Sequence, residues 1–176
     1  MTDGRKSQAL HDARAMALGL AEDLDRLLGP PTEPVRSRTE LVLAFSLVRG
    51  TRGYIERVVM QINGCYEKGW YDACAVMIRR LLETLIIECF ENYKIADKIK
   101  SGSGDFLYLS DLIAAVTKES AWNLGRKAKA ALPRLKEVGD QSAHSRRFIA
   151  HRSDLDKLLP DLRIAVQELL ALAALK

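Results

Sequence analysis

The spacing of apolar residues along the chain predicts helices almost throughout. In the first thirty residues, leucine and alanine recur at steps of three and four, which places them on one face of a helix. These positions are Leu10, Ala13, Ala17, Leu20, Leu24, Leu27 and Leu28. The Gly-Pro-Pro-Thr-Glu-Pro run at 29–34 stops that helix and predicts a short stiff linker. We therefore expect an N-terminal helix with its linker at 1–34 and a helical bundle at 35–176, in one compact domain overall.

The segment from about Tyr71 to Ala96 carries the broadest apolar stripe in the chain. A stripe this wide contacts two or more neighbours, so we expect this helix at the centre of the bundle. Arg79 and Glu83 are four residues apart on it and therefore face each other across one turn. The apolar positions are Ala75, Ile78, Leu81, Leu82, Leu85, Ile86, Cys89, Phe90 and Tyr93.

Glycine positions divide the neighbouring segments into shorter elements. A helical pattern runs over 39–48, breaks near Gly50 and Gly53, and resumes over 54–67. The Ser-Gly-Ser-Gly run at 101–104 is typical of a flexible loop, because no strand-to-helix phosphate cradle surrounds it. The chain shows no strand alternation and no internal repeat. We therefore predict an all-α bundle of five or more helices.

Proline, serine and aspartate indicate where the later helices begin. Ser-Asp at 110–111 starts a helix that runs through Val116, and Pro133 suits the first turn of another short helix. The acidic residues within 153–156 are a favourable N-terminal signal for the last helix. Pro160 inside that helix predicts either a kink or the actual first turn.

Composition excludes several classes of protein. The 176 residues are 48% hydrophobic and 28% charged, which are ordinary globular values. No apolar run approaches the roughly 20 residues of a membrane helix, and no apolar stretch follows the first charges, so we expect neither a membrane anchor nor a signal peptide. Cys65, Cys74 and Cys89 lack the close spacing of zinc or redox motifs. We expect buried thiols in the cytoplasm, no metal site and no cofactor.

The charge is concentrated in one segment. From Ala121 to Arg152 the chain holds eight basic and two acidic residues, a net +6 that exceeds the +4 of the whole chain. A basic segment on a nearly neutral body favours a phosphate-bearing partner, and a solvated charged face is the alternative. The residues are Arg126, Lys127, Lys129, Arg134, Lys136, Arg146, Arg147 and Arg152, opposed by Glu137 and Asp140.

Two imidazoles and two guanidiniums lie within eight residues, at His144, Arg146, Arg147 and His151. Arginine binds phosphate with two parallel hydrogen bonds, and histidine transfers protons near neutral pH. Together they suit metal-free cleavage of an RNA phosphodiester, in which the 2′-hydroxyl of the substrate attacks. The same residues could instead hold an anion, or pair with core acids such as Glu83.

Three segments resemble the HEPN (higher eukaryotes and prokaryotes nucleotide-binding) superfamily, in particular a bacterial branch without an assigned role. They are Ile-Arg-Arg-Leu-Leu-Glu at 78–83, Val-Gly-Asp-Gln-Ser-Ala-His at 138–144, and Glu-Leu-Leu at 168–170 within a long terminal helix. The resemblance covers about 57–175. It implies an all-α bundle that is usually dimeric. Catalytic members are metal-independent ribonucleases, whereas others bind nucleotides or RNA, or act as partners of toxins and defence systems.

The catalytic HEPN motif is an arginine followed by four to six residues and a histidine, and this chain matches it imperfectly. Arg146 and His151 have the required spacing, but Arg147 stands where a polar residue is usual and His151 lies beyond the Ala-His position. His144 has no arginine at 137–139. We therefore favour a degenerate motif.

The favoured function is a cytoplasmic homodimer that binds RNA or another phosphate ligand, or acts as an interaction module, in a defence or stress system. The alternatives are an active metal-independent endoribonuclease at a dimer interface and a ligand-free protein-interaction scaffold. The candidate catalytic residues are His144, Arg146, Arg147 and His151. The candidate ligand-binding residues are Arg79, Glu83, Asp140, Arg126, Lys127 and Lys129.

Overall fold

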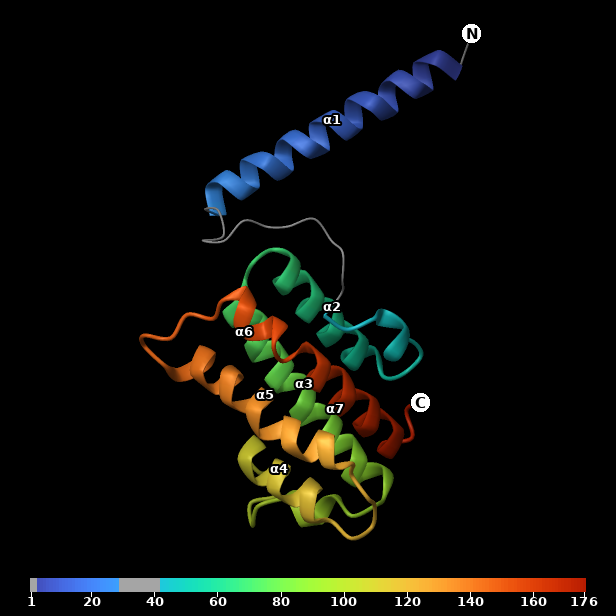
Figure 1. Ribbon diagram of the computed structural model, residues 1–176. Coiled ribbons are helices and arrows are strands. Elements are labelled where there is room, and N and C mark those ends of the chain that lie inside the picture. Colours follow the sequence, from blue (N-terminus) through green and yellow to red (C-terminus); the bar gives the residue numbers. More distant parts are fainter. Residues whose placement is uncertain (1–2, 29–41) are drawn as a thin grey trace. The chain divides into compact units, whose positions relative to one another are not determined.

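The computed structural model describes residues 3–28 and 42–176, and the chain divides into two compact units, Met1–Pro34 and Val35–Lys176 (Figure 1). The described part of the first unit is helix α1, Asp3–Leu28. It exposes Leu10, Met16 and Leu20. The predicted linker at 29–34 lies outside the described residues. No described helix has the length and apolar content needed to cross a membrane.

The second unit is an all-α bundle, as the apolar periodicity predicts. The described part of the chain forms no strand, although an isolated antiparallel bridge joins Lys100 and Phe106. Short 3-10 helices occupy Phe45–Leu47 and Ala96–Ile99. The helices are α2 (Gly53–Glu67), α3 (Tyr71–Asn92), α4 (Leu109–Lys118), α5 (Arg126–His144), α6 (Arg152–Asp156) and α7 (Leu159–Leu172).

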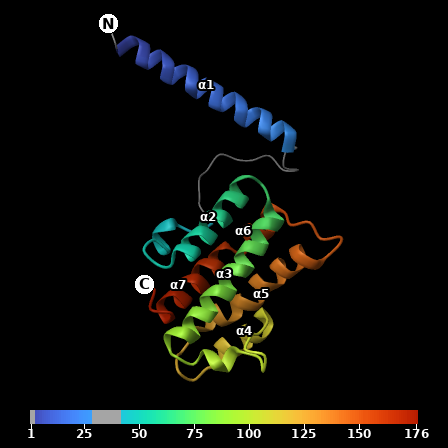
Figure 2. The same cartoon turned by 180° about the vertical axis from the view of Figure 1, so that it is seen from behind.

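Helix α3 is the centre of the bundle. It packs against α2, α4, α5, α6 and α7, and Figure 2 shows it running between α2 on one side and α5 on the other. Burying one large apolar side chain contributes roughly 1.5–3 kcal/mol, so this helix accounts for much of the core. Tyr93, predicted on the same stripe, follows the end of α3 and is 40% exposed. The buried members of the stripe are Ala75, Ile78, Leu81, Leu82, Leu85, Ile86, Cys89 and Phe90.

The prediction of a helix over 39–48 is wrong for the residues of this range that the structure describes. Residues 42–48 form a bend and one 3-10 turn, while 39–41 lie outside the described residues. The buried Asn63 side chain accepts a hydrogen bond from the Leu43 N–H at 3.0 Å and donates one to the Leu43 carbonyl at 2.8 Å. This pair of bonds satisfies the backbone of Leu43 without a helix, so Leu43 and Val42 are buried on a non-helical segment.

Two prolines have different positions in their helices. Pro133 is in the interior of α5, which begins at Arg126, so the prediction that it occupies a first turn is wrong. Pro133 is exposed, and solvent can therefore satisfy the carbonyl that lacks a proline N–H partner. Pro160 is in the first turn of α7, which confirms the second of the two alternatives for that residue. The short helix α6 precedes it as a separate element.

Candidate functional site

Helix α5 lies close against α3 at Gly139. A Cβ atom at this position would lie 2.8 Å from the Cβ of Arg79 and 3.0 Å from the carbonyl oxygen of Ala75. Real Cβ atoms essentially never approach another heavy atom within 3.0 Å, so a side chain here would separate the helices. Glycine is therefore required by the closeness of α3, and the candidate motif Gly139-Asp140 has a packing role.

Asp140 forms the centre of an ion-pair cluster between α3 and α5. Its carboxylate accepts a hydrogen bond from Arg79 Nε at 2.7 Å and another from the Lys136 ammonium. Arg79 also lies 3.9 Å from the Glu83 carboxylate, which confirms that these two residues face each other. Burial by itself raises the pKa of Asp140, but the hydrogen bonds from Lys136 and Arg79 outweigh it and hold this pKa below its usual value.

The start of α5 is set by α7. The Glu168 carboxylate accepts a hydrogen bond of 2.6 Å from the N–H of Gly125, the residue before α5. A Cβ atom at Gly125 would lie 2.5 Å from Glu168 Oε1, so a side chain at this position would require the Glu168 carboxylate to shift. A negative charge is also favourable at a helix N-terminus. Glu168 belongs to the sequence that resembles HEPN domains, and its observed role is structural.

The histidine- and arginine-rich segment forms the loop between α5 and α6. His144 is the last residue of α5, and it is exposed together with Arg146 and Arg147. The Ser145 hydroxyl accepts hydrogen bonds from the N–H groups of Arg147 at 3.4 Å and Phe148 at 3.2 Å. The loop therefore has some internal order and presents both guanidiniums to solvent.

The end of this loop is anchored to the bundle. The N–H of Ala150 donates to the Asp72 carboxylate of α3 at 3.1 Å, and the N–H of His151 donates to Asp154 at 3.0 Å. Arg152 lies over the ring of Tyr66 in α2, 5.3 Å from its centroid. His151 is thus fixed at the start of α6, at the opposite end of the loop from His144.

The structure separates the predicted site residues into three groups: the cluster between α3 and α5, the end of α5 with its following loop, and the cations near the start of α5. Arg79 pairs with both Glu83 and Asp140 between α3 and α5. His144, Arg146, Arg147 and His151 are exposed at the end of α5 and in the loop that follows it, and His144 makes no hydrogen bond to Glu83. The interpretation in which His144 pairs with Glu83 is therefore wrong.

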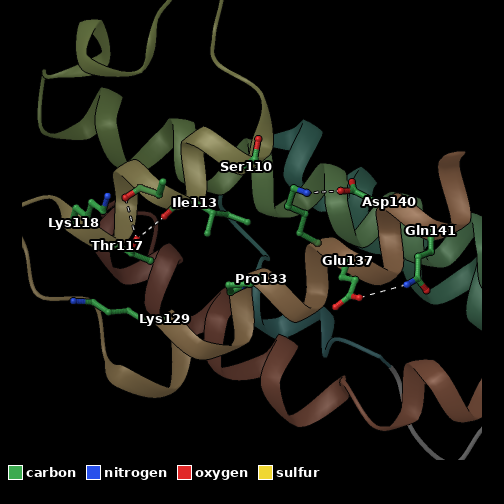
Figure 3. A pocket seen from close by; sticks show the side chains of 11 residues that line it. Ser110, Ile113, Thr117, Lys118, Lys129, Pro133, Glu137, Asp140 and Gln141 are labelled. Atoms are coloured by element: carbon green, nitrogen blue, oxygen red, sulfur yellow. Dashed lines mark hydrogen bonds and ion pairs between the residues drawn. The ribbon is translucent and has the colours of Figure 1, made fainter.

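The cations of α5 border two pockets. A pocket of about 400 Å³ between α5 and α7 is lined by Arg126, Lys127 and Arg134, of which Arg134 pairs with Asp161 at 2.8 Å. A larger pocket of about 650 Å³ lies between α4 and α5 and includes Lys129 (Figure 3). Sequence reasoning grouped these cations together, whereas α5 directs them toward different neighbours.

Helix α4 lines one side of the larger pocket. The sequence predicts a helix in this region but did not indicate that it belongs to a site. The pocket residues from α4 recur at steps of three, one, three and one, which is the spacing of a single helix face. That spacing is the signal from which this half of the pocket could have been found. The residues are Ser110, Ile113, Ala114, Thr117 and Lys118.

The cysteines lie in the core region. Cys74 and Cys89 are buried and Cys65 is half-buried, all three as free thiols. Burial raises the pKa of both buried thiols, that of Cys89 to about 12, so these thiols remain protonated at neutral pH. Within 3–28 and 42–176, no three His, Cys, Asp or Glu side chains are grouped in a way that could hold a metal ion.

The fold and these features define an all-α protein with a basic helix and loop. The chain matches no protein-family model and no curated protein, and no solved structure matches it.

Proposed function

We propose that the protein binds RNA through a basic face, defined as Arg126, Lys127, His144, Arg146 and Arg147. The observation that carries the proposal is their common exposure along one helix and its following loop. None of the five forms an ion pair with a carboxylate among the described residues. A cation without an acidic partner is available to a phosphate group.

The length of the basic face supports a polymeric anion. Arg126 and His144 are eighteen residues apart, about five turns at 3.6 residues per turn, so they lie on the same side of α5. At about 1.5 Å per residue, they are roughly 27 Å apart along the helix axis. A single phosphate cannot contact both ends, whereas a nucleic-acid strand presents phosphates at regular intervals.

The contacts would be made mainly with the RNA backbone. The basic face contains no aromatic side chain on which a base could stack, so binding depends on charge and discriminates little between sequences. The resemblance to HEPN domains supports RNA as the polymer and homodimerisation as the assembly. We therefore include a cytoplasmic homodimer in the proposal, and sedimentation equilibrium of the full chain tests it.

The test measures binding of fluorescein-labelled single-stranded and hairpin RNA by anisotropy, in EDTA, from about 50 to about 200 mM salt. Four engaged arginine and lysine side chains predict a slope of about −3 for log K against log salt on single strands. Arg146→Gln with Arg147→Gln should weaken binding at least tenfold and make the slope shallower by roughly 1.4. Binding that is absent, or insensitive to salt, overturns the proposal.

A matched control removes the same charge elsewhere. Arg57 in α2 and Arg80 in α3 are exposed, so Arg57→Gln with Arg80→Gln lowers the net charge equally without changing the basic face. The RNA affinity of this double variant should stay within about threefold of wild type, because the substitutions change only the long-range electrostatic field of the protein. An equal loss in both double variants would show that net charge alone determines binding.

The same reactions separate binding from catalysis. His144 lies two residues from Arg146, and both are exposed, so a scissile phosphate in this loop would have a base and a cation nearby. A metal-independent ribonuclease would produce 2′,3′-cyclic phosphate ends in EDTA, and the His144→Ala, His151→Ala double variant would abolish them. Retention without cleavage supports a binding module. If the RNA is neither retained nor cut, the protein-interaction scaffold becomes the better interpretation.

A further inference from the structure

The pocket between α4 and α5 has an apolar lining with charged residues at its rim. Ile113 and Ala114 from α4 and Pro133 from α5 provide apolar surface within a volume of about 650 Å³. Pockets that bind small organic molecules have volumes of about 300–1,000 Å³ and combine such a lining with a few polar groups. The volume and lining therefore match those of a small-molecule site.

Two lysines of this pocket have no acidic partner. Lys118 of α4 and Lys129 of α5 form no ion pair among the described residues, and Figure 3 shows both ammonium groups toward the same end of the pocket. Lys136 differs from them because Asp140 neutralises it. The pocket thus offers positive charge beside Ile113, Ala114 and Pro133.

The other polar groups of the pocket are mostly paired. The Gln141 amide donates to the Glu137 carboxylate at 3.5 Å, and the Thr117 hydroxyl donates to the carbonyl of Ile113 at 2.8 Å. The Asp140 carboxylate already forms ion pairs with Arg79 and Lys136. Lys118 and Lys129 are therefore uncompensated positive charges, whereas the negative charge of Glu137 lies beside Gln141 toward the other end of the pocket (Figure 3), so the end with both lysines favours an anion.

We propose that the pocket between α4 and α5 binds a small organic anion with an apolar body. The anionic group contacts Lys118 and Lys129, and the apolar body packs against Ile113, Ala114 and Pro133. The proposal is independent of RNA binding, because the pocket shares no residue with the basic face. Each proposal can therefore fail without affecting the other.

The test titrates 1-naphthyl phosphate, 1-naphthoate and uncharged 1-naphthol into the ¹⁵N-labelled full chain and follows backbone amide shifts. We expect saturable shifts in α4 and α5, near Ser110 and Lys129, with both anions and much weaker effects from the alcohol. A preference for the phosphate or the carboxylate identifies the headgroup. Absence of saturable binding at millimolar concentrations, or equal binding of the alcohol, overturns the proposal.

Three variants localise the effect. Lys118→Gln and Lys129→Gln should each weaken anion binding roughly tenfold, because each removes a charged hydrogen-bond donor. Lys157→Gln, which removes the same charge from the exposed residue that follows α6, outside both the pocket and the basic face, should leave the affinity unchanged. Equal losses in all three variants would show nonspecific charge attraction and overturn the proposal.

A fourth variant tests the apolar part of the pocket. Ala114 is exposed on α4, so Ala114→Leu extends an apolar side chain into the pocket with little effect on folding. It should weaken binding of both anions while amide spectra elsewhere stay unchanged. If this variant instead dissociates a dimer of the full chain, the pocket is a surface for a second copy and the proposal is wrong.

Discussion

The two halves of segment 138–151 differ in what surrounds them. Gly139 permits close packing against α3, and Asp140 binds Arg79 of α3 and Lys136 of its own helix. His144, Arg146 and Arg147, only a few residues later, are exposed. Residues that form one continuous pattern in the sequence therefore have different physical roles. Substitutions in the first half should affect stability, and substitutions in the second half should affect binding.

The largest expected effect comes from Gly139→Ala. The new methyl group would meet Arg79 and the Ala75 carbonyl, so α5 must move away from α3. Overpacking outweighs the better helix propensity of alanine, and we expect the free energy of unfolding to fall by about 2 kcal/mol. Urea denaturation followed by circular dichroism measures the change.

Gly64→Ala in α2 is the matched control for this substitution. A Cβ atom there meets nothing within 4 Å, so the same change should stabilise the protein by up to about 1 kcal/mol. If both substitutions changed the free energy of unfolding in the same direction, the packing role assigned to Gly139 would be contradicted.

Asp140→Asn should have the next largest effect. It should lower the free energy of unfolding by about 1.5 kcal/mol at neutral pH, because two charged hydrogen bonds are weakened. The folded-state pKa of Asp140 lies below its usual value. The contribution of Asp140 to the free energy of unfolding is therefore complete above the unfolded-state pKa of about 3.9, and it is lost as the pH falls through the lower, folded-state pKa. The difference in unfolding free energy between wild type and variant should shrink on acidification.

Asp97→Asn provides the comparison for that pH profile. The Asp97 side chain is fully exposed and lies 3.6 Å from Lys100. Solvent screens such a pair, so the variant should unfold like wild type across the same pH range. A constant offset between Asp140→Asn and wild type from neutral to acidic pH would refute the role of ionised Asp140.

Asp72→Ala tests how the far end of the segment is held. It removes the acceptor for the N–H of Ala150, which anchors the loop to α3. We expect a loss of about 1 kcal/mol and faster amide hydrogen exchange at Ala150, with little change in the middle of α5. Unchanged exchange at Ala150 would mean that this hydrogen bond does not hold the loop.

The smallest effect on stability should come from Arg146→Gln with Arg147→Gln. Both side chains are exposed and leave the core unchanged, so the unfolding free energy should stay within about 0.5 kcal/mol of wild type. The same variant should lose RNA affinity, as proposed above. A clear loss of stability would place this loop with the structural half of the segment.

Part of the candidate site could be predicted from local spacing. The contact between Arg79 and Glu83 follows from their separation by four residues in a helix, and the structure confirms it. The partner of Arg79 could not be predicted in this way, because Asp140 is 61 residues away. The role of Asp140 depends on how α5 crosses α3, which no local pattern contains.

The sequence by itself determined the all-α class, the central position of α3 and the location of the positive charge. Those features follow from apolar periodicity and composition, which act within a few residues. Tertiary structure decided the non-helical path of 42–48, the start of α5 beside Glu168, the separation of Asp140 from the exposed loop, and the pocket between α4 and α5. These features arise from hydrogen bonds and close approaches between distant segments, which form only when the helices pack.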